Sequence, residues 1–202
     1  MRRLLLATGN PGKVREYRDL LCDVPFEVVT PPEAGIATTV EETGGTLEEN
    51  ARLKATALAE ESGLLALADD SGLEVDALGG EPGPLSARYA GEDASDEDRV
   101  RYLLSRLGDV PWPGRTARFR CVIAIASPSG RTDLCQGQCE GFIMLEPRGA
   151  NGFGYDPVFY LPELGMTMAE LPQEAKNRVS HRGRAAKEAR RLLASWADEQ
   201  AS

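Results

Sequence analysis

The chain has 202 residues, of which 42% are hydrophobic and 27% are charged, and its formal net charge is −9. This composition is that of a folded globular protein and excludes a largely disordered chain. The negative charge argues against a partner of duplex nucleic acid, which binds basic surfaces. The length suits a single domain, 1–202, built as one body or as two lobes that share a core.

The apolar segments are too short to cross a membrane. Runs such as VIAIA (122–126) fall far below the roughly 20 residues that a transmembrane helix needs. The start MRRLLLA resembles a secretory leader, but its apolar part ends at Thr8, short of the about 7–15 residues required. We therefore expect a cytoplasmic protein without a membrane partner.

The four cysteines show no C-x-x-C spacing, and the chain has one histidine. We expect neither a zinc site nor a disulfide framework. Cys121 stands among apolar residues and is most simply a small core side chain.

Charge is distributed unevenly along the chain. Residues 33–98 include 17 acidic and 3 basic side chains, whereas residues 173–191 include 7 basic and 2 acidic ones. Two solvated faces would explain this pattern. A ligand that needs both a metal ion and cationic contacts, such as a nucleotide with magnesium, would also explain it.

Strands and helices alternate along the chain. Hydrophobic periodicity predicts strands at 3–8, 26–30, 64–68, 116–127 and 132–145, the last as one long strand or a pair bent near Gly137. It predicts helices at 13–22, 46–63, 96–108 and 184–199. The stretch around Pro162 and Pro172 is expected to be irregular. This order predicts an α/β fold with a mixed sheet.

The helix at 46–63 has the strongest local evidence. Thr46 and Glu49 have the spacing of a capping box, and Gly63 is typical of a helix end. Apolar residues recur at helical spacing between them, at Leu47, Ala51, Ala55 and Leu58.

The first candidate site is the segment LLLATGNPGK (4–13), in which a strand, a turn and a lysine follow one another. This order suggests a phosphate cradle. It is not a Walker A loop, because the first glycine would stand at Ala7 and Val14 replaces the hydroxyl residue. An ordinary strand-to-helix turn is the alternative.

Two further candidates are acidic. Glu41 and Glu42 precede a Gly-Gly turn and lie outside the helix cap, so they are candidate metal ligands. Asp69 and Asp70 follow the apolar segment 64–68, and open α/β sheets place their sites at strand ends. A carboxylate there can hold magnesium and can orient or deprotonate a water. A strand-end turn capped by Asp and Ser is the simpler alternative.

The last two candidates lie near the C-terminus. In GFGYDP (152–157), Phe153 or Tyr155 could stack on a base, and Asp156 could accept a base N–H. An aromatic side chain packed beneath a turn would look the same. The basic run KNRVSHRGR (176–184) could clamp a polar ligand or could simply face solvent.

Taken in this order, the motifs resemble the inosine triphosphate pyrophosphatase family, which acts on non-standard purine nucleoside triphosphates. The resemblance spans nearly the whole chain and rests on five segments: TGNPGKVRE (8–16), EETGGTLEENARLKA (41–55), ADDSGLEVDALGGEPGPLSARYAG (68–91), GFGYDPVF (152–159) and SHRGRA (180–185).

The resemblance implies an elongated α/β fold with a long twisted mixed sheet, two lobes and a central substrate cleft, assembled as a homodimer. It implies Mg²⁺-dependent hydrolysis of ITP, dITP and XTP to the monophosphate and pyrophosphate, which clears deaminated purines from the nucleotide pool. It also implies a purine nucleoside triphosphate as the partner, rather than a nucleic acid.

The resemblance further implies roles for single residues. Asp70 is expected to be the general base and a metal ligand, and Glu41 to be the second metal ligand. The adjacent Glu42 could instead match that second position. The phosphate turn would comprise Thr8, Gly9, Asn10, Pro11, Gly12 and Lys13. The rest of the substrate site would comprise Ser71, Phe153, Gly154, Tyr155, Asp156, Lys176, His181 and Arg182.

The sequence does not decide how the purine base is selected, and it leaves alternative functions open. A donor from His181 or Arg182 to the 6-oxo group would disfavour adenine, but guanine carries the same group. The alternatives are a pyrophosphatase for other modified nucleotides, a nucleotide-binding module without turnover, and a structural dimerisation protein. The acidic candidates argue against a module that only binds nucleotide, because binding a polyanion gains little from nearby carboxylates.

Overall fold

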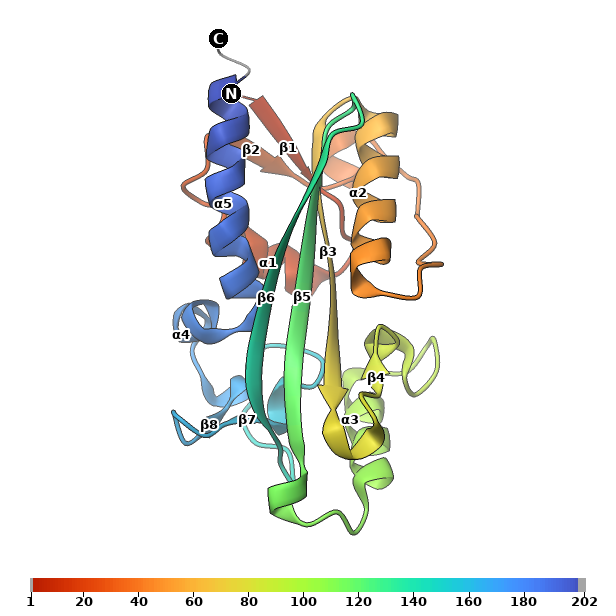
Figure 1. Ribbon diagram of the computed structural model, residues 1–202, viewed down its shortest axis with the longest axis vertical. Coiled ribbons are helices and arrows are strands. Elements are labelled where there is room, and N and C mark those ends of the chain that lie inside the picture. Colours follow the sequence, from red (N-terminus) through yellow and green to blue (C-terminus); the bar gives the residue numbers. More distant parts are fainter. Residues whose placement is uncertain (1, 200–202) are drawn as a thin grey trace. The chain divides into compact units, whose positions relative to one another are not determined.

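The computed structural model describes residues 2–199, which form a mixed α/β fold (Figure 1). The hydrogen-bonded strand order in these residues is β2-β1-β3-β5-β6-β7-β8, and β4 pairs with β3. The strands are β1 (Arg2–Leu6), β2 (Phe26–Val29), β3 (Leu65–Val75), β4 (Pro82–Gly83), β5 (Thr116–Ala126), β6 (Thr132–Ile143), β7 (Phe159–Leu161) and β8 (Met166–Thr167). The α-helices are α1 (Pro11–Leu20), α2 (Leu47–Ser62), α3 (Asp96–Leu107), α4 (Gln173–Val179) and α5 (His181–Glu199).

The described residues form two compact units. Unit 1 comprises the residues up to Asp70, the segment Cys121–Gly137 and the residues from Arg182 onward. Unit 2 comprises Ser71–Arg120 and Gln138–His181. Strands β3, β5 and β6 each contribute residues to both units.

In unit 1, helices cover both faces of the sheet. Strand β1 runs parallel to both β2 and β3, with Leu4 opposite Val28 and Leu65. Successive strand side chains point to opposite faces. Leu4 therefore packs in a cluster with α1 and α5, and Leu5 packs in another with α2. Burial on both faces explains why these strands are continuously apolar.

Helix α1 begins at Pro11, two residues before the predicted start. Asn10 caps it, since its side-chain oxygen accepts hydrogen bonds from the backbone N–H of Gly12 at 2.8 Å and of Lys13 at 3.1 Å. Proline suits the first helical position, where no intrahelical partner exists for an N–H. The predicted phosphate turn is thus the N-terminus of a helix.

Helix α2 confirms the prediction for 46–63. Both bonds of the Thr46–Glu49 capping box are present, and Gly63 ends the helix with a left-handed backbone at φ 66°. The predicted apolar stripe is buried.

Strand β3 corrects the prediction for 64–68. It continues to Val75, so Asp69 and Asp70 lie within a strand and not at its end. The strand that ends here is the neighbouring β1, whose last paired residue is Leu6, opposite Leu67. Asp69 and Asp70 interrupt the apolar pattern but do not end the strand. Hydrogen bonds and ion pairs with neighbouring side chains offset the cost of burying both carboxylates.

Unit 2 confirms the predicted helix at 96–108. Its buried residues Val100, Leu103 and Leu107 pack in one cluster with Leu73 and Phe119. The strand prediction for 116–127 is also confirmed. The segment 132–145 forms one long strand, β6, rather than a pair.

The C-terminal third differs most from prediction. The stretch expected to be irregular contains β7, β8 and the seven-residue helix α4, whose N-cap is Pro172. Helix α5 begins at His181, three residues before the predicted start. The basic run therefore lies mainly on two helices and not in a loop.

The remaining expectations concern cysteines and membranes. All four cysteines are free, and Cys121 is buried as predicted. Among residues 2–199, no helix combines the length and apolar character needed to span a membrane.

Candidate active site

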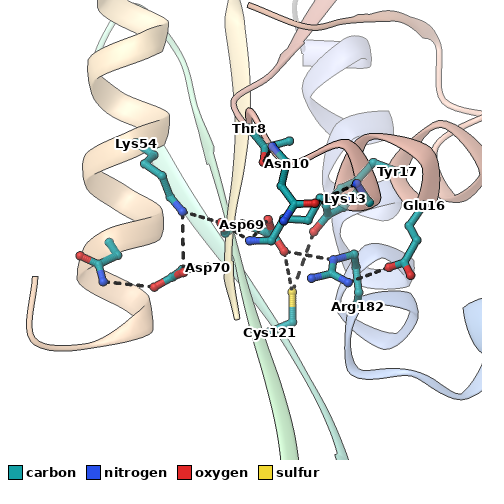
Figure 2. Close-up of polar contacts among 12 residues, drawn as sticks. Thr8, Asn10, Lys13, Glu16, Tyr17, Lys54, Asp69, Asp70, Cys121 and Arg182 are labelled. Carbon is teal, nitrogen blue, oxygen red and sulfur yellow. Dashed lines mark hydrogen bonds and ion pairs between the residues drawn. The ribbon is translucent and has the colours of Figure 1, made fainter. Parts of the chain in front are cut away.

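Asp69 and Asp70 project to opposite faces of β3, as neighbouring strand residues must (Figure 2). Asp69 faces α1 and α5, where it meets Lys13 and Arg182. Asp70 faces α2, where it meets Lys54. One strand thus places two adjacent carboxylates in two different environments, both within unit 1.

Asp69 is the centre of a buried ion network. Its Oδ1 lies 2.8 Å from Lys13 Nζ, and its Oδ2 accepts a hydrogen bond from Arg182 Nε at 3.1 Å. Arg182 Nη1 also donates to Glu16 Oε2 at 2.6 Å. The side chains of Asp69, Arg182 and Glu16 are at most 2% exposed.

These cations keep Asp69 ionised. Burial alone would raise the pKa of Asp69, but Lys13, Arg182 and Lys54 outweigh it and hold the pKa well below the ordinary value of 3.8. The Cys121 thiol donates to Asp69 Oδ2 at 3.7 Å, and burial, together with the charge of Asp69, raises the pKa of that thiol to about 12. Asp69 is therefore ionised at neutral pH and is a poor proton acceptor there.

Asp70 has the opposite character. Its Oδ2 accepts a hydrogen bond from Asn50 Nδ2 at 3.1 Å, and its Oδ1 lies 3.7 Å from Lys54 Nζ. Burial raises the pKa of Asp70, with a further contribution from Glu42, although Lys54 and Lys13 oppose it. A carboxylate that binds protons more readily than usual is suited to general-base work.

Lys54 contacts both Glu42 and Asp70. Its Nζ lies 2.5 Å from Glu42 Oε1 and donates to the backbone carbonyl of Asp69 at 2.7 Å. Burial alone would lower the pKa of Lys54, but Asp70, Asp69 and Glu42 outweigh it and raise the pKa. Lys54 is therefore a permanent cation between two carboxylates.

The structure brings Glu42, rather than Glu41, into contact with Lys54 near Asp70. Glu41 is exposed, and its backbone carbonyl accepts a bond from the N–H of Thr43. Glu42 Oε1 lies 2.5 Å and Asp70 Oδ1 lies 3.7 Å from Lys54 Nζ, so the two carboxylates flank the same ammonium group. Of the two neighbouring glutamates, Glu42 is the one placed to share an ion with Asp70.

The donor set suits one kind of metal. Within residues 2–199, no group of three or more His, Cys, Asp or Glu side chains is arranged to hold an ion. Magnesium does not need such a cage, because it keeps several waters and binds through one or two carboxylates plus substrate phosphates. Glu42 and Asp70 fit that requirement.

The predicted phosphate turn lies at the start of α1. The Asn10 N–H donates to Thr8 Oγ1 at 3.2 Å, and residues Gly9, Asn10 and Pro11 are exposed. Helix N-termini favour anions through their backbone N–H groups and dipole. Lys13, in the first turn, carries the nearest cation, which here neutralises Asp69.

A second group of predicted residues lies in unit 2, around the turn 152–156. Asp156 Oδ2 accepts hydrogen bonds from the Phe153 N–H at 2.9 Å and from Lys176 Nζ at 2.5 Å. The same Nζ lies 4.9 Å from the centre of the Phe153 ring. Asp156 and Lys176 are both buried, so their contacts hold the turn in shape.

The two aromatic candidates of this turn differ. Tyr155 is buried, and its hydroxyl donates to the backbone carbonyl of Ser86 at 2.8 Å. Phe153 is half-buried, and Lys176 Nζ lies over its ring. Gly152 is required beside them, because it has φ 76° and an added Cβ would lie 2.1 Å from Asp156 Oδ2.

The remaining predicted residues divide between the units. His181 is buried in unit 2 with its ring stacked on Phe119 at a centroid distance of 4.6 Å. Arg182, the next residue, belongs to the Asp69 network of unit 1. Ser71 is half-buried in β3, directly after Asp70.

Sequence reasoning missed Asn50 and Lys54, which contact Asp70, and Glu16, which pairs with Arg182. Asn50 and Lys54 are four residues apart on α2, one position before Ala51 and Ala55 of the buried stripe. That spacing places both side chains beside the sheet. It was available from the sequence, whereas the pairing of Glu16 with Arg182, across most of the chain, was not.

Comparison with known proteins decides the family. The family model described as the Ham1 family matches residues 4–192. The chain belongs to the Ham1 family. This confirms the resemblance that the five sequence motifs indicated.

The relatives match along nearly their whole length. A dITP/XTP pyrophosphatase of Desulforamulus reducens is 55% identical over 191 residues, which are 95% of each chain. One of Bacillus subtilis is 46% identical over 193 residues, covering 96% of this chain and 98% of the relative.

Solved structures agree with the fold. A Ham1 protein of Staphylococcus aureus has a TM-score of 0.84 at 43% identity, covering 95% of this chain and 98% of that one. A HAM1 protein of Coxiella burnetii has a TM-score of 0.86 at 42% identity, covering 96% and 100%. The prediction of an α/β fold with a mixed sheet is confirmed.

Proposed function

We propose that this protein hydrolyses non-standard purine nucleoside triphosphates, namely dITP, XTP and ITP, to the nucleoside monophosphate and pyrophosphate. Relatives at 46–55% identity over nearly the full chain bear the name dITP/XTP pyrophosphatase. The observation that carries the proposal is the pair of adjacent aspartates on β3, one held as an anion among cations and one with a raised pKa.

The triphosphate is assigned to the start of α1. The exposed turn 9–11 offers the helix N-terminus, and Lys13 can exchange its contact with Asp69 for a phosphate oxygen. Before that exchange Asp69 contacts the lysine from the buried side, and Arg182, which also pairs with Glu16, contacts Asp69. Neutralising the polyphosphate charge is the main task in such a reaction.

The general base is assigned to Asp70. It takes a proton from a water whose oxygen attacks the α-phosphorus, and the bond from that phosphorus to the bridging oxygen breaks as pyrophosphate leaves. The hydrogen bond from Asn50 orients the carboxylate, and its raised pKa helps it to accept the proton. A general base of this kind contributes about 10²–10⁴-fold in rate.

Glu42 and Asp70 are assigned as the residues that hold Mg²⁺, and Glu42 replaces our expectation for Glu41. The ion would neutralise triphosphate charge that the lysines leave uncompensated. Lys54 keeps Glu42 and Asp70 together by contacting both.

The base is assigned to the turn 152–156, with Phe153 as the stacking ring. Asp156 and Lys176 shape its turn, and roles for Ser71 and His181 toward the base stay predictions. We further propose that the protein acts as a homodimer in the cytoplasm on free nucleotides, without a nucleic acid or membrane partner.

A substrate panel tests the proposal. Pyrophosphate release would be measured with dITP, XTP, ITP, ATP and GTP, each with Mg²⁺ and with EDTA. We expect Mg²⁺-dependent release from the first three and little from ATP and GTP. Release from other modified nucleotides alone would favour a different house-cleaning pyrophosphatase, and tight binding without release would favour a regulatory module.

A further inference from the structure

Helix α3 contacts the turn 152–156 through its first residue. Asp96 Oδ2 accepts a hydrogen bond from the backbone N–H of Gly154 at 2.7 Å, although the two residues are 58 positions apart. Both lie in unit 2. The contact joins the start of a helix to the residue that follows the predicted stacking ring, Phe153.

Asp96 differs from its acidic neighbours in the first turn of α3. Acidic side chains are generally favourable there because of the helix dipole. Asp98 serves the helix itself, through a capping box with Ser95. Glu97 is exposed. Asp96 instead reaches off the helix, so a helix-terminal role alone does not account for its direction.

Arg99 fixes the Asp96 carboxylate from the other side. It forms an ion pair with Asp96 Oδ1, and its Nη1 donates to the backbone carbonyls of Ala87 at 2.9 Å and Ala94 at 2.6 Å. The acceptor that meets Gly154 is therefore oriented by the chain that precedes the helix. A carboxylate held in this way is a preorganised acceptor.

A cavity lies between α3 and the loop residues around Gly154. Its volume is about 340 Å³, and it is lined by Asp96, Glu97, Val100, Arg101, Leu104, Pro147, Gly154 and Pro157. Side chains of α3 and of the loop therefore do not fill the space between them at this point. Where packing does not hold the turn, the hydrogen bond from Gly154 to Asp96 has more influence on its position.

The other half of the turn is held by separate contacts. Lys176 holds Asp156, and Ser86 holds the Tyr155 hydroxyl. Gly154 itself has φ 62°, a conformation that glycine adopts readily and that offers little rigidity of its own. Asp156 and Lys176 also contact Phe153, and Asp96 adds the contact at the next residue, Gly154.

We propose that Asp96 is a positioning residue, which holds Gly154 and so sets the orientation of the Phe153 ring toward the purine base. This inference rests on the proposed function, because it assigns Phe153 to the base. Asp96 touches no reacting atom in this assignment. Its loss should weaken substrate binding more than it slows the chemical step.

Three variants test the proposal: Asp96→Ala, Asp96→Asn and the matched control Glu97→Ala. Glu97 lies in the same helical turn and lines the same cavity. The asparagine keeps an oxygen acceptor for Gly154 but loses the charge that pairs with Arg99. The measurements are KM and kcat for dITP, the thermal midpoint, and hydrogen exchange at the Gly154 amide.

We expect Asp96→Ala to raise KM about tenfold with kcat changed less than about threefold, since a hydrogen bond to a charged acceptor is lost. Its Gly154 amide should exchange faster, while Asp96→Asn and Glu97→Ala stay close to the parent protein in both respects. An unchanged KM and amide protection in Asp96→Ala would overturn the proposal. So would equal losses in the alanine and asparagine variants.

The design separates this inference from the proposed function. If the parent protein releases no pyrophosphate from dITP, XTP or ITP, the proposed function fails. The Gly154 amide still reports in that case whether Asp96 holds the turn. A parent protein that is active while Asp96→Ala behaves like Glu97→Ala refutes the role of Asp96 alone.

Discussion

The Asp69 network leads to a quantitative prediction about folding stability. Asp69→Asn removes a negative charge that contacts both Lys13 and Arg182. The Asp69 side chain is 0% exposed and that of Arg182 is 2% exposed, so water cannot solvate the guanidinium in place of the lost carboxylate. Removing one partner of a buried ion pair typically costs about 3–5 kcal/mol, and although Arg182 keeps its ion pair with Glu16, both Lys13 and Arg182 lose their ion pairs with Asp69.

This loss should be visible in thermal melting. For a chain of this size, 1 kcal/mol shifts the midpoint by about 2–4 °C, so Asp69→Asn should melt on the order of 10 °C below the parent protein. The assay is a thermal melt at neutral pH in EDTA, followed by circular dichroism. EDTA keeps metal binding from altering either protein.

The same substitution at the next residue is the control. Burial raises the pKa of Asp70, so its ionised form opposes folding once the pH has risen through the folded pKa. Asp70→Asn should therefore melt at or above the parent temperature at neutral pH. Equal destabilisation by both substitutions, or a parent-like midpoint for Asp69→Asn, would refute the reasoning.

The pH dependence has a defined sign for Asp69. Its pKa in the folded protein lies below the ordinary value of 3.8, so the stability it contributes is present above that value. That stability is lost as the pH falls below about 4 toward the folded pKa. Asp69→Asn should reduce this acid-induced loss, as measured by urea unfolding between pH 5 and the lowest pH at which the parent protein folds.

Three further predictions concern the site itself. Asp70→Asn should lower kcat for dITP by about 10²–10⁴-fold while the circular dichroism spectrum is unchanged, and near-normal turnover would remove Asp70 from its role. Glu42→Gln should raise the Mg²⁺ concentration needed for half-maximal activity on the order of tenfold, whereas Glu41→Gln should not, and a larger effect at Glu41 would restore our first assignment. Gly152→Ala should lower the free energy of unfolding by about 2 kcal/mol or more, because of its left-handed backbone and the close carboxylate, in contrast to Gly9→Ala, whose added Cβ meets no atom within 4 Å.

Elements with strong local determinants could be predicted from the sequence. Helix α2 carries its capping box and its terminal glycine within the segment itself, and both were found in place. Helix α4 was missed because seven residues give too little periodicity and Pro172 suggested irregular chain, although proline suits the position before a helix. The start of α5 was missed because His181 and Arg182 are polar yet buried.

Strand pairing could not be predicted in the same way. The polar pair at Asp69 suggested a strand end, whereas β3 continues to Val75 and it is β1 that ends nearby. The pairing register depends on hydrogen bonds to segments far away in the chain. No local pattern in the segment 64–75 specifies it.

The sequence by itself determined the α/β class, the family and the set of charged residues available for the chemistry, because periodicity and motif order are properties of the linear chain. Only the tertiary structure decided that the pKa of Asp69 is lowered and that of Asp70 raised, and that Glu42 rather than Glu41 shares Lys54 with Asp70. The physical reason is that a carboxylate acquires its pKa from burial and from neighbouring charges. Lys13 and Arg182 reach Asp69 from opposite ends of the chain, and Lys54 reaches Asp70 from α2, so folding alone brings these charges together.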